Sequence, residues 1–163
     1  KEVPTLNKNN IKLHVIGDLE MLPANARRAL EEALEETNVN TGLNLVMALS
    51  YSSRWELVNA VKNIGLDVEK GLIRAEDINA DTLQHYLATS NLPDPELMIR
   101  TSGEYRISNF LLYQLAYAEL YFTNTRWPDF RKENLYEAII DFQSRERRFG
   151  KTGHQIQSDA QIA

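Results

Sequence analysis

The feature that most constrains the fold is a set of short apolar runs, each too short for a buried helix and each bounded by turn residues. Residues 11–17 (IKLHVIG) end at a glycine, and residues 43–49 (LNLVMAL) are followed by the polar segment SYSS. ELMI (96–99) lies beside two prolines, and ELYFT (119–123) precedes WPDF. Runs of this length that are apolar on both faces are typical of strands in a covered parallel sheet.

Helix patterns separate these runs. The segment ANARRALEEALEET (24–37) follows Pro23 and consists largely of strong helix formers. Further helices are predicted over four segments, namely residues 55–64, 80–90, 109–118 and 132–149. Strands that alternate with helices predict an α/β fold with a mainly parallel sheet, covered by helices on both faces. We expect one domain over residues 1–150 and a disordered tail over residues 151–163.

The composition excludes several classes of protein. With 43% hydrophobic and 25% charged residues, the chain is neither disordered nor a membrane protein. A net charge of −5 argues against a nucleic-acid binder, and the absence of cysteine excludes disulfides and thiolate chemistry. With no visible signal peptide, these features predict a cytoplasmic location.

Two arginines stand six residues apart in the loop RTSGEYRISNF (100–110). Arg100 ends a predicted strand, where ligands of parallel α/β folds bind. Gly103 permits a tight turn before Arg106, and Ser108 and Asn109 stand where the next predicted helix begins, with N–H groups free to bind an anion. Two guanidinium groups, a hydroxyl group and a helix N-terminus predict a phosphate or diphosphate site.

Glu119 is a further candidate because it interrupts the apolar stretch LAYAELYF, where a carboxylate is costly without a partner. It could hold a divalent metal beside a diphosphate, or it could pair with Arg100 or Arg106. The alternative for the two arginines is a structural network with Glu104 or Glu119. In the SYSSR loop (50–54), the side chains could face a ligand, although capping of the next helix by a serine is the commoner role.

The segments DPELMIRTSGEYRISNFLLYQLAYAELYFTNTRWPDF and RERRFG resemble the cis-prenyltransferases, and most of all bacterial undecaprenyl diphosphate synthase (isoprenyl transferase). The resemblance includes IKLHVIGDLEMLP and LNLVMALSYSSRWELVNAVK and runs to Gly150, so it covers nearly all of the chain. It implies a homodimeric, Mg²⁺-dependent transferase. Such an enzyme condenses isopentenyl diphosphate onto an allylic diphosphate, such as farnesyl diphosphate. Its product is a Z-polyprenyl diphosphate such as undecaprenyl diphosphate, a precursor of the cell-wall lipid carrier.

The resemblance also implies roles for individual residues. Substrate diphosphate would be bound by Arg100, Arg106, Ser108, Arg148 and Gly150, the last two in a motif that reaches a site across the dimer. Glu119 would help to hold Mg²⁺. The family's N-terminal motif, similar to MDGNGRWA, is absent, and with it the aspartate that helps to bind Mg²⁺. No catalytic residue is therefore expected in this chain.

Two further expectations follow from the resemblance. The apolar tunnel of the family could be lined by Leu45, Met47 and Leu49, for which ordinary core packing is the commoner role. The lipid product would allow peripheral contact with a membrane. Because the aspartate motif is absent, the alternative function is a non-catalytic partner or scaffold subunit, or a diphosphate-binding module.

Overall fold

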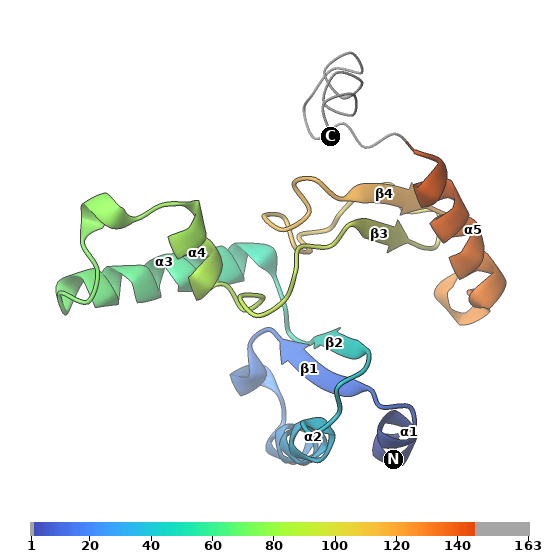
Figure 1. Cartoon of the computed structure of the whole chain (residues 1–163), viewed down its shortest axis with the longest axis horizontal. Coiled ribbons are helices and arrows are strands. Elements are labelled where there is room, and N and C mark those ends of the chain that lie inside the picture. Colours follow the sequence, from blue (N-terminus) through green and yellow to red (C-terminus); the bar gives the residue numbers. More distant parts are fainter. Residues whose placement is uncertain (1, 146–163) are drawn as a thin grey trace, which may run out of the picture. The chain divides into compact units, whose positions relative to one another are not determined.

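A computed structural model of the chain describes residues 2–145 (Figure 1). The α-helices are α1 (Val3–Lys8), α2 (Ala24–Thr37), α3 (Ser53–Glu69), α4 (Ala80–Tyr86) and α5 (Lys132–Ser144). The strands are β1 (Lys12–Ile16), β2 (Asn44–Ala48), β3 (Leu97–Arg100) and β4 (Glu119–Phe122). Short 3-10 turns cover Leu19–Met21, Ala75–Asp77 and Trp127–Asp129.

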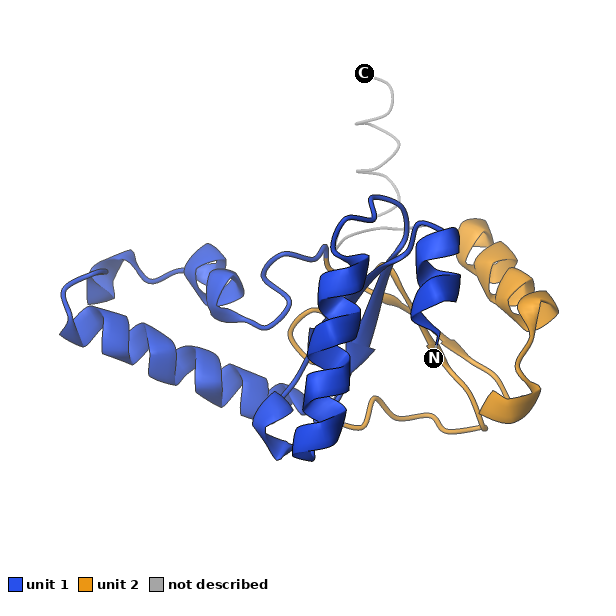
Figure 2. Ribbon diagram, turned by 90° about the horizontal axis from the view of Figure 1, so that it is seen from below, with its two compact units in different colours: residues 1–93, 109–111 blue, residues 94–108, 112–163 orange. Residues whose placement is uncertain are grey.

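The chain divides into two compact units (Figure 2). The first contains residues 1–93 and 109–111, and the second contains residues 94–108 and 112–163. Whether both belong to one domain over residues 1–150 stays a prediction. The tail over residues 151–163 lies outside the described residues.

The strands of each unit pair in parallel, which confirms the predicted α/β class. In the first unit β1 pairs with β2, from Lys12 opposite Asn44 to Ile16 opposite Ala48. In the second unit β3 pairs with β4 in the same sense. Helices α1 and α2 pack against β1, and α5 packs against β4.

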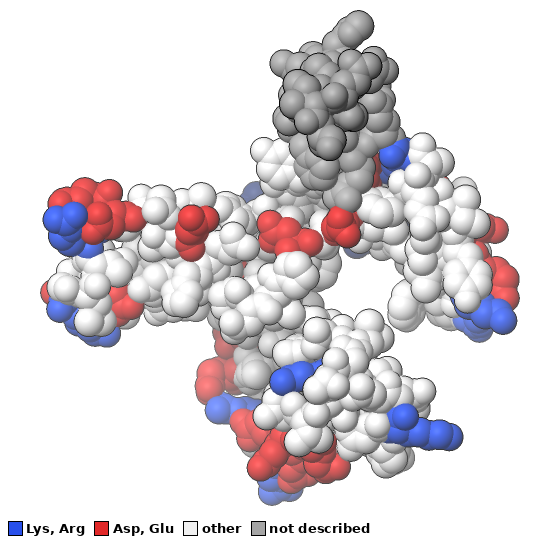
Figure 3. Space-filling model, viewed as in Figure 1, with Lys and Arg blue, Asp and Glu red and all other residues white. Residues whose placement is uncertain are grey.

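Helix α2 joins the first sheet through its last residue. Thr37 is fully buried, and its hydroxyl group donates to the carbonyl of Ala33 at 2.8 Å and accepts the N–H of Leu13 at 3.2 Å. The outer face of α2 is charged, with Arg27 between two glutamates, and Figure 3 shows acidic and basic side chains together over this helix.

The apolar side chains of β2 are not core residues in the described structure. Leu45 and Met47 are 40% and 41% exposed, although Leu13 and Ile16 on the neighbouring strand β1 are buried. Ordinary core packing, the commoner role for such residues, is therefore not what the structure shows for Leu45 and Met47.

One predicted helix is wrong. Residues 109–118 form turns, because Asn109 and Leu111 have left-handed backbones with φ of 61° and 46°, which an α-helix excludes. Helix α1 was not predicted, although Pro4 in its first turn is a helix-start signal. The predicted helix over residues 55–64 extends to Ser53–Glu69.

Replacement of Thr37 by valine should lower the free energy of unfolding by about 1–3 kcal/mol, because it leaves the buried N–H of Leu13 without an acceptor. Urea unfolding of the variant measures this loss. Thr41→Val is the control, since Thr41 is exposed and should change the free energy by about 0.5 kcal/mol at most. Equal effects of the two substitutions would show that Thr37 does not tie α2 to β1.

Candidate functional site

The loop that follows β3 turns back sharply at two residues with left-handed backbones. Ser102 and Gly103 have φ of 70° and 67°, as the predicted glycine turn requires. Their N–H groups donate to the carbonyls of Thr125 and Thr123, each at 2.9 Å. The loop is therefore held beside the segment that follows β4, at the carboxyl end of the strand pair.

The two arginines of this loop differ in their partners. Arg106 forms an ion pair with Glu104 at 2.5 Å, and its side chain is 68% exposed. Arg100 ends β3 and forms no ion pair with any residue that the structure describes. The alternative given for the two arginines, a network with Glu104, is thus present for Arg106 and is not seen for Arg100 within the described residues.

Ser108 and Asn109 do not begin a helix, so the predicted anion site at a helix N-terminus is wrong. Ser108 has a left-handed backbone with φ of 55°. Asn109 instead lies at the start of α3, within the first unit, where its side-chain and main-chain oxygens accept the N–H groups of Arg54 at 3.0 Å and Ser53 at 2.9 Å. Its amide nitrogen donates to the hydroxyl group of Ser52 at 2.7 Å. Asn109 therefore satisfies helix N–H groups that an anion could otherwise bind.

The SYSSR loop has the structural role that the commoner interpretation predicts. The hydroxyl group of Ser52 caps α3 by accepting the N–H of Trp55 at 3.4 Å. The phenol of Tyr51 donates to Glu56 at 2.6 Å, and the other oxygen of Glu56 accepts the N–H of Ala88 at 3.0 Å. Burial, followed by the hydrogen bond to Glu56, raises the pKa of Tyr51. Ser52 and Tyr51 are thus engaged in holding the loop.

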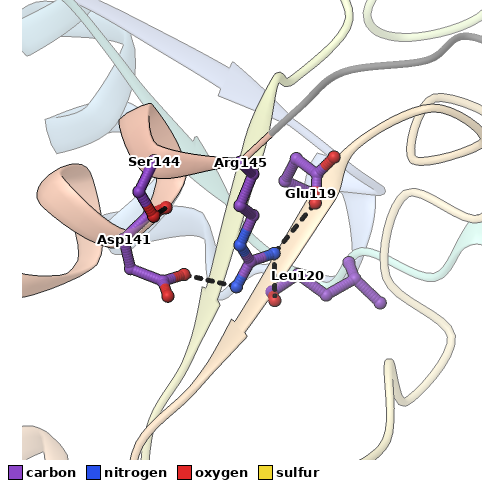
Figure 4. Close-up of polar contacts among 5 residues, drawn as sticks. All are labelled: Glu119, Leu120, Asp141, Ser144 and Arg145. Atoms are coloured by element: carbon purple, nitrogen blue, oxygen red, sulfur yellow. Dashed lines mark hydrogen bonds and ion pairs between the residues drawn. The ribbon is translucent and has the colours of Figure 1, made fainter. Parts of the chain in front are cut away.

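Glu119 forms an ion pair, but not with either predicted arginine. Its Oε2 accepts a hydrogen bond from Nη1 of Arg145 at 2.9 Å (Figure 4). The same guanidinium group donates to the carbonyl of Leu120 at 3.0 Å and to Asp141. The hydrogen bond to Glu119 raises the pKa of Arg145, against the effect of desolvation. Arg145 and Asp141 were missed by the sequence analysis, although Arg145 opens the RERRFG segment on which the resemblance rests.

The strand register separates Glu119 from Arg100. Glu119 lies opposite Leu97, whereas Arg100 lies opposite Phe122 at the other end of the strand pair. Three residues of strand correspond to about 10 Å. The loop of Arg100 and Arg106 and the carboxylate of Glu119 therefore start from opposite ends of this small sheet. Arg148 and Gly150 lie outside the described residues.

The described residues contain no cluster of three or more histidine, cysteine, aspartate or glutamate side chains that could hold a metal. A divalent metal beside Glu119 would need donors in addition to the described residues. Glu119 fits such a role, because only its Oε2 takes part in the interactions described and Mg²⁺ commonly binds through one or two carboxylates, water and substrate phosphates. Across residues 2–145, no helix has the length and apolar character needed to cross a membrane.

The role of Asn109 can be tested by comparing two substitutions. Asn109→Gly should lower the free energy of unfolding by about 1 kcal/mol through loss of the cap, since glycine tolerates the left-handed backbone. Asn109→Ala should cost about 1 kcal/mol more, because alanine does not tolerate it. Chemical unfolding measures both, with Asn79→Ala, which removes the cap of α4, as the control for simple cap loss. Equal stability of the glycine variant and the parent would contradict the capping role.

Comparison with known proteins shows which family this chain is similar to. Residues 1–150 match the family model described as "Putative undecaprenyl diphosphate synthase". The chain is 52% identical over 159 residues to an isoprenyl transferase of Chlorobaculum tepidum. The matched segment covers 98% of this chain and 60% of the relative. It is 55% identical over 148 residues to an isoprenyl transferase of Bacillus thuringiensis subsp. konkukian, covering 91% and 57%.

A solved structure shows the same similarity. The lavandulyl diphosphate synthase of Lavandula x intermedia, crystallised with dimethylallyl diphosphate, superposes with a TM-score of 0.90 at 35% identity. The match covers 93% of this chain and 66% of that protein. The chain thus spans about 60% of the length of the curated relatives it matches. It belongs to the prenyltransferase family of undecaprenyl diphosphate synthase-like proteins.

Proposed function

We propose that the protein acts in an isoprenyl transferase, which condenses isopentenyl diphosphate onto an allylic diphosphate to make a Z-polyprenyl diphosphate. In this reaction the allylic carbon–oxygen bond breaks and diphosphate leaves. A carbon–carbon bond forms to the terminal alkene carbon of isopentenyl diphosphate, which then loses a proton. The observation that carries the proposal is Arg100, at the carboxyl end of a parallel strand pair, whose guanidinium group has no carboxylate partner among residues 2–145.

The loop offers positive charge that a diphosphate can use. Arg106 is mostly exposed, and within the described residues it pairs with one carboxylate, that of Glu104, which a doubly or triply charged diphosphate can displace. Ser108 follows two residues later with its hydroxyl group in no hydrogen bond to the described residues. Arg100, Arg106 and Ser108 are therefore proposed to bind the diphosphate of isopentenyl diphosphate, with Arg148 and Gly150 contributing from the C-terminal motif.

We propose that Glu119 would help to hold Mg²⁺ near the diphosphate of isopentenyl diphosphate. Because Glu119 and Arg100 lie about 10 Å apart along the strands, the two long side chains and the bound diphosphate would have to bridge that distance. Bound Mg²⁺ would offset the charge of the diphosphates and stabilise the one that leaves.

Similar proteins support the choice of substrates. The isoprenyl transferase relatives share about half of their residues with this chain over the matched segment. Dimethylallyl diphosphate, bound to the lavandulyl diphosphate synthase, is an allylic diphosphate, the class of second substrate proposed here. We propose farnesyl diphosphate or a longer allylic primer, an undecaprenyl product for the cell wall, and a homodimer that works in the cytoplasm and meets the membrane through its product.

An assay of the complete gene product tests this function. Farnesyl diphosphate, labelled isopentenyl diphosphate and Mg²⁺ should yield labelled long-chain polyprenyl diphosphate. Binding of isopentenyl diphosphate without any product would instead support a non-catalytic partner subunit or a diphosphate-binding module.

Replacement of Arg106 by alanine should weaken the binding of isopentenyl diphosphate by roughly 2–5 kcal/mol, because one of the guanidinium groups proposed to bind its diphosphate is lost. The Michaelis constant for isopentenyl diphosphate in the complete gene product measures this change. Arg28→Ala is the control, since it removes the same charge from the exposed surface of α2. An unchanged Michaelis constant and rate for the Arg106 variant would refute the assignment.

A further inference from the structure

We propose that Arg145 is a positioning residue that fixes the carboxylate of Glu119 for a divalent metal. The inference rests on the proposed role of Glu119 and extends it to a residue outside the candidate set. Arg145 follows directly after α5, and Glu119 begins β4, so the two come from segments 26 positions apart in sequence.

The contacts of Arg145 restrain the carboxylate on one side only. One terminal nitrogen, Nη1, binds both Oε2 of Glu119 at 2.9 Å and the carbonyl of Leu120 at 3.0 Å. Because that carbonyl belongs to the backbone of β4, the guanidinium group is fixed to the strand that carries Glu119. Within the interactions described, Oε1 of Glu119 accepts no hydrogen bond and keeps its lone pairs for another ligand.

Asp141 restrains the guanidinium group from its other side. Asp141 lies in α5, one helical turn before Arg145, and its Oδ2 accepts a hydrogen bond from Nη2 of Arg145 (Figure 4). The planar guanidinium group therefore spans from a helix carboxylate to a strand carboxylate, a geometry that the single ammonium group of lysine cannot reproduce. With both terminal nitrogens engaged and 29% of the side chain exposed, Arg145 acts on Glu119 and is not itself an anion ligand.

A purely structural alternative is that Arg145 only fastens the end of α5 to β4. The two roles differ in what they change. Loss of a purely structural contact lowers thermal stability, whereas loss of a positioning residue weakens metal binding in a protein that remains folded. Side chains that hydrogen-bond a metal ligand typically change metal affinity 10- to 100-fold when they are replaced.

The test measures binding of Mn²⁺, as a paramagnetic substitute for Mg²⁺, to the complete gene product with isopentenyl diphosphate present and no allylic substrate. The signal of free Mn²⁺ in electron paramagnetic resonance gives the dissociation constant without turnover. Three variants are compared with the parent, namely Arg145→Lys, Asp141→Asn and Glu119→Gln. The matched control is Arg27→Lys, because Arg27 also lies between two carboxylates, Glu20 at 2.8 Å and Glu31 at 3.0 Å.

We expect Arg145→Lys to raise the Mn²⁺ dissociation constant about 10-fold or more, and Glu119→Gln to raise it at least as much. Asp141→Asn should raise it to a smaller extent, and Arg27→Lys should leave it unchanged. The Asp141 variant decides the matter if Arg145→Lys does not fold, because it loosens the guanidinium group and leaves it in place.

Two results would overturn the inference, and they are distinguishable. In the first, Glu119→Gln weakens Mn²⁺ binding while the Arg145 and Asp141 variants bind Mn²⁺ as the parent does. This result would support the proposed metal role of Glu119 and leave Arg145 with a structural role alone. Parental Mn²⁺ binding in Glu119→Gln would remove the metal role of Glu119, and the inference about Arg145 with it.

Discussion

Strands that pair in parallel need a long connection between them, and this requirement decides where the candidate site residues lie. Between β3 and β4 the connection covers residues 101–118, and both Arg106 and Ser108 belong to it. The same parallel register places Arg100 at the carboxyl end of β3 and Glu119 at the amino end of β4. The second unit therefore presents positive charge at one end of its sheet and a carboxylate at the other, and a substrate that uses both has to reach between them.

Three arginines of this unit illustrate how the partners of a charge separate structural from functional roles. The guanidinium group of Arg145 donates hydrogen bonds to two carboxylates and a carbonyl of the described residues, so its charge is neutralised within the protein. Arg106 has one carboxylate partner among the described residues, and a solvent-exposed ion pair of this kind contributes little to stability. Arg100 has no carboxylate partner in residues 2–145. Of these three arginines, Arg100 and Arg106 are the ones that could bind an anionic ligand at small cost to the fold.

Structural features that depend on neighbouring residues in the chain could be predicted from the sequence. The four strands follow from short apolar runs, and the glycine turn at Gly103 was predicted from the loop sequence. The helix over residues 109–118 was wrong because Asn109 finds its partners in α3, more than fifty residues away in sequence. For Glu119 the need for a partner was evident from its apolar surroundings, but the register and the course of α5, which select Arg145, are not evident from spacing.

The left-handed residues around the candidate site show how its shape is maintained. Ser102 and Ser108 have positive φ values that cost on the order of 1 kcal/mol or more for residues with side chains. Such conformations persist only where the surroundings determine them, and at Ser102 the hydrogen bond to Thr125 does so. A loop that holds strained residues before any ligand binds loses less conformational freedom on binding, which favours affinity for the ligand. The energy that fixes this loop therefore comes from the protein, through the segment after β4, and need not be supplied by the diphosphate that we propose it binds.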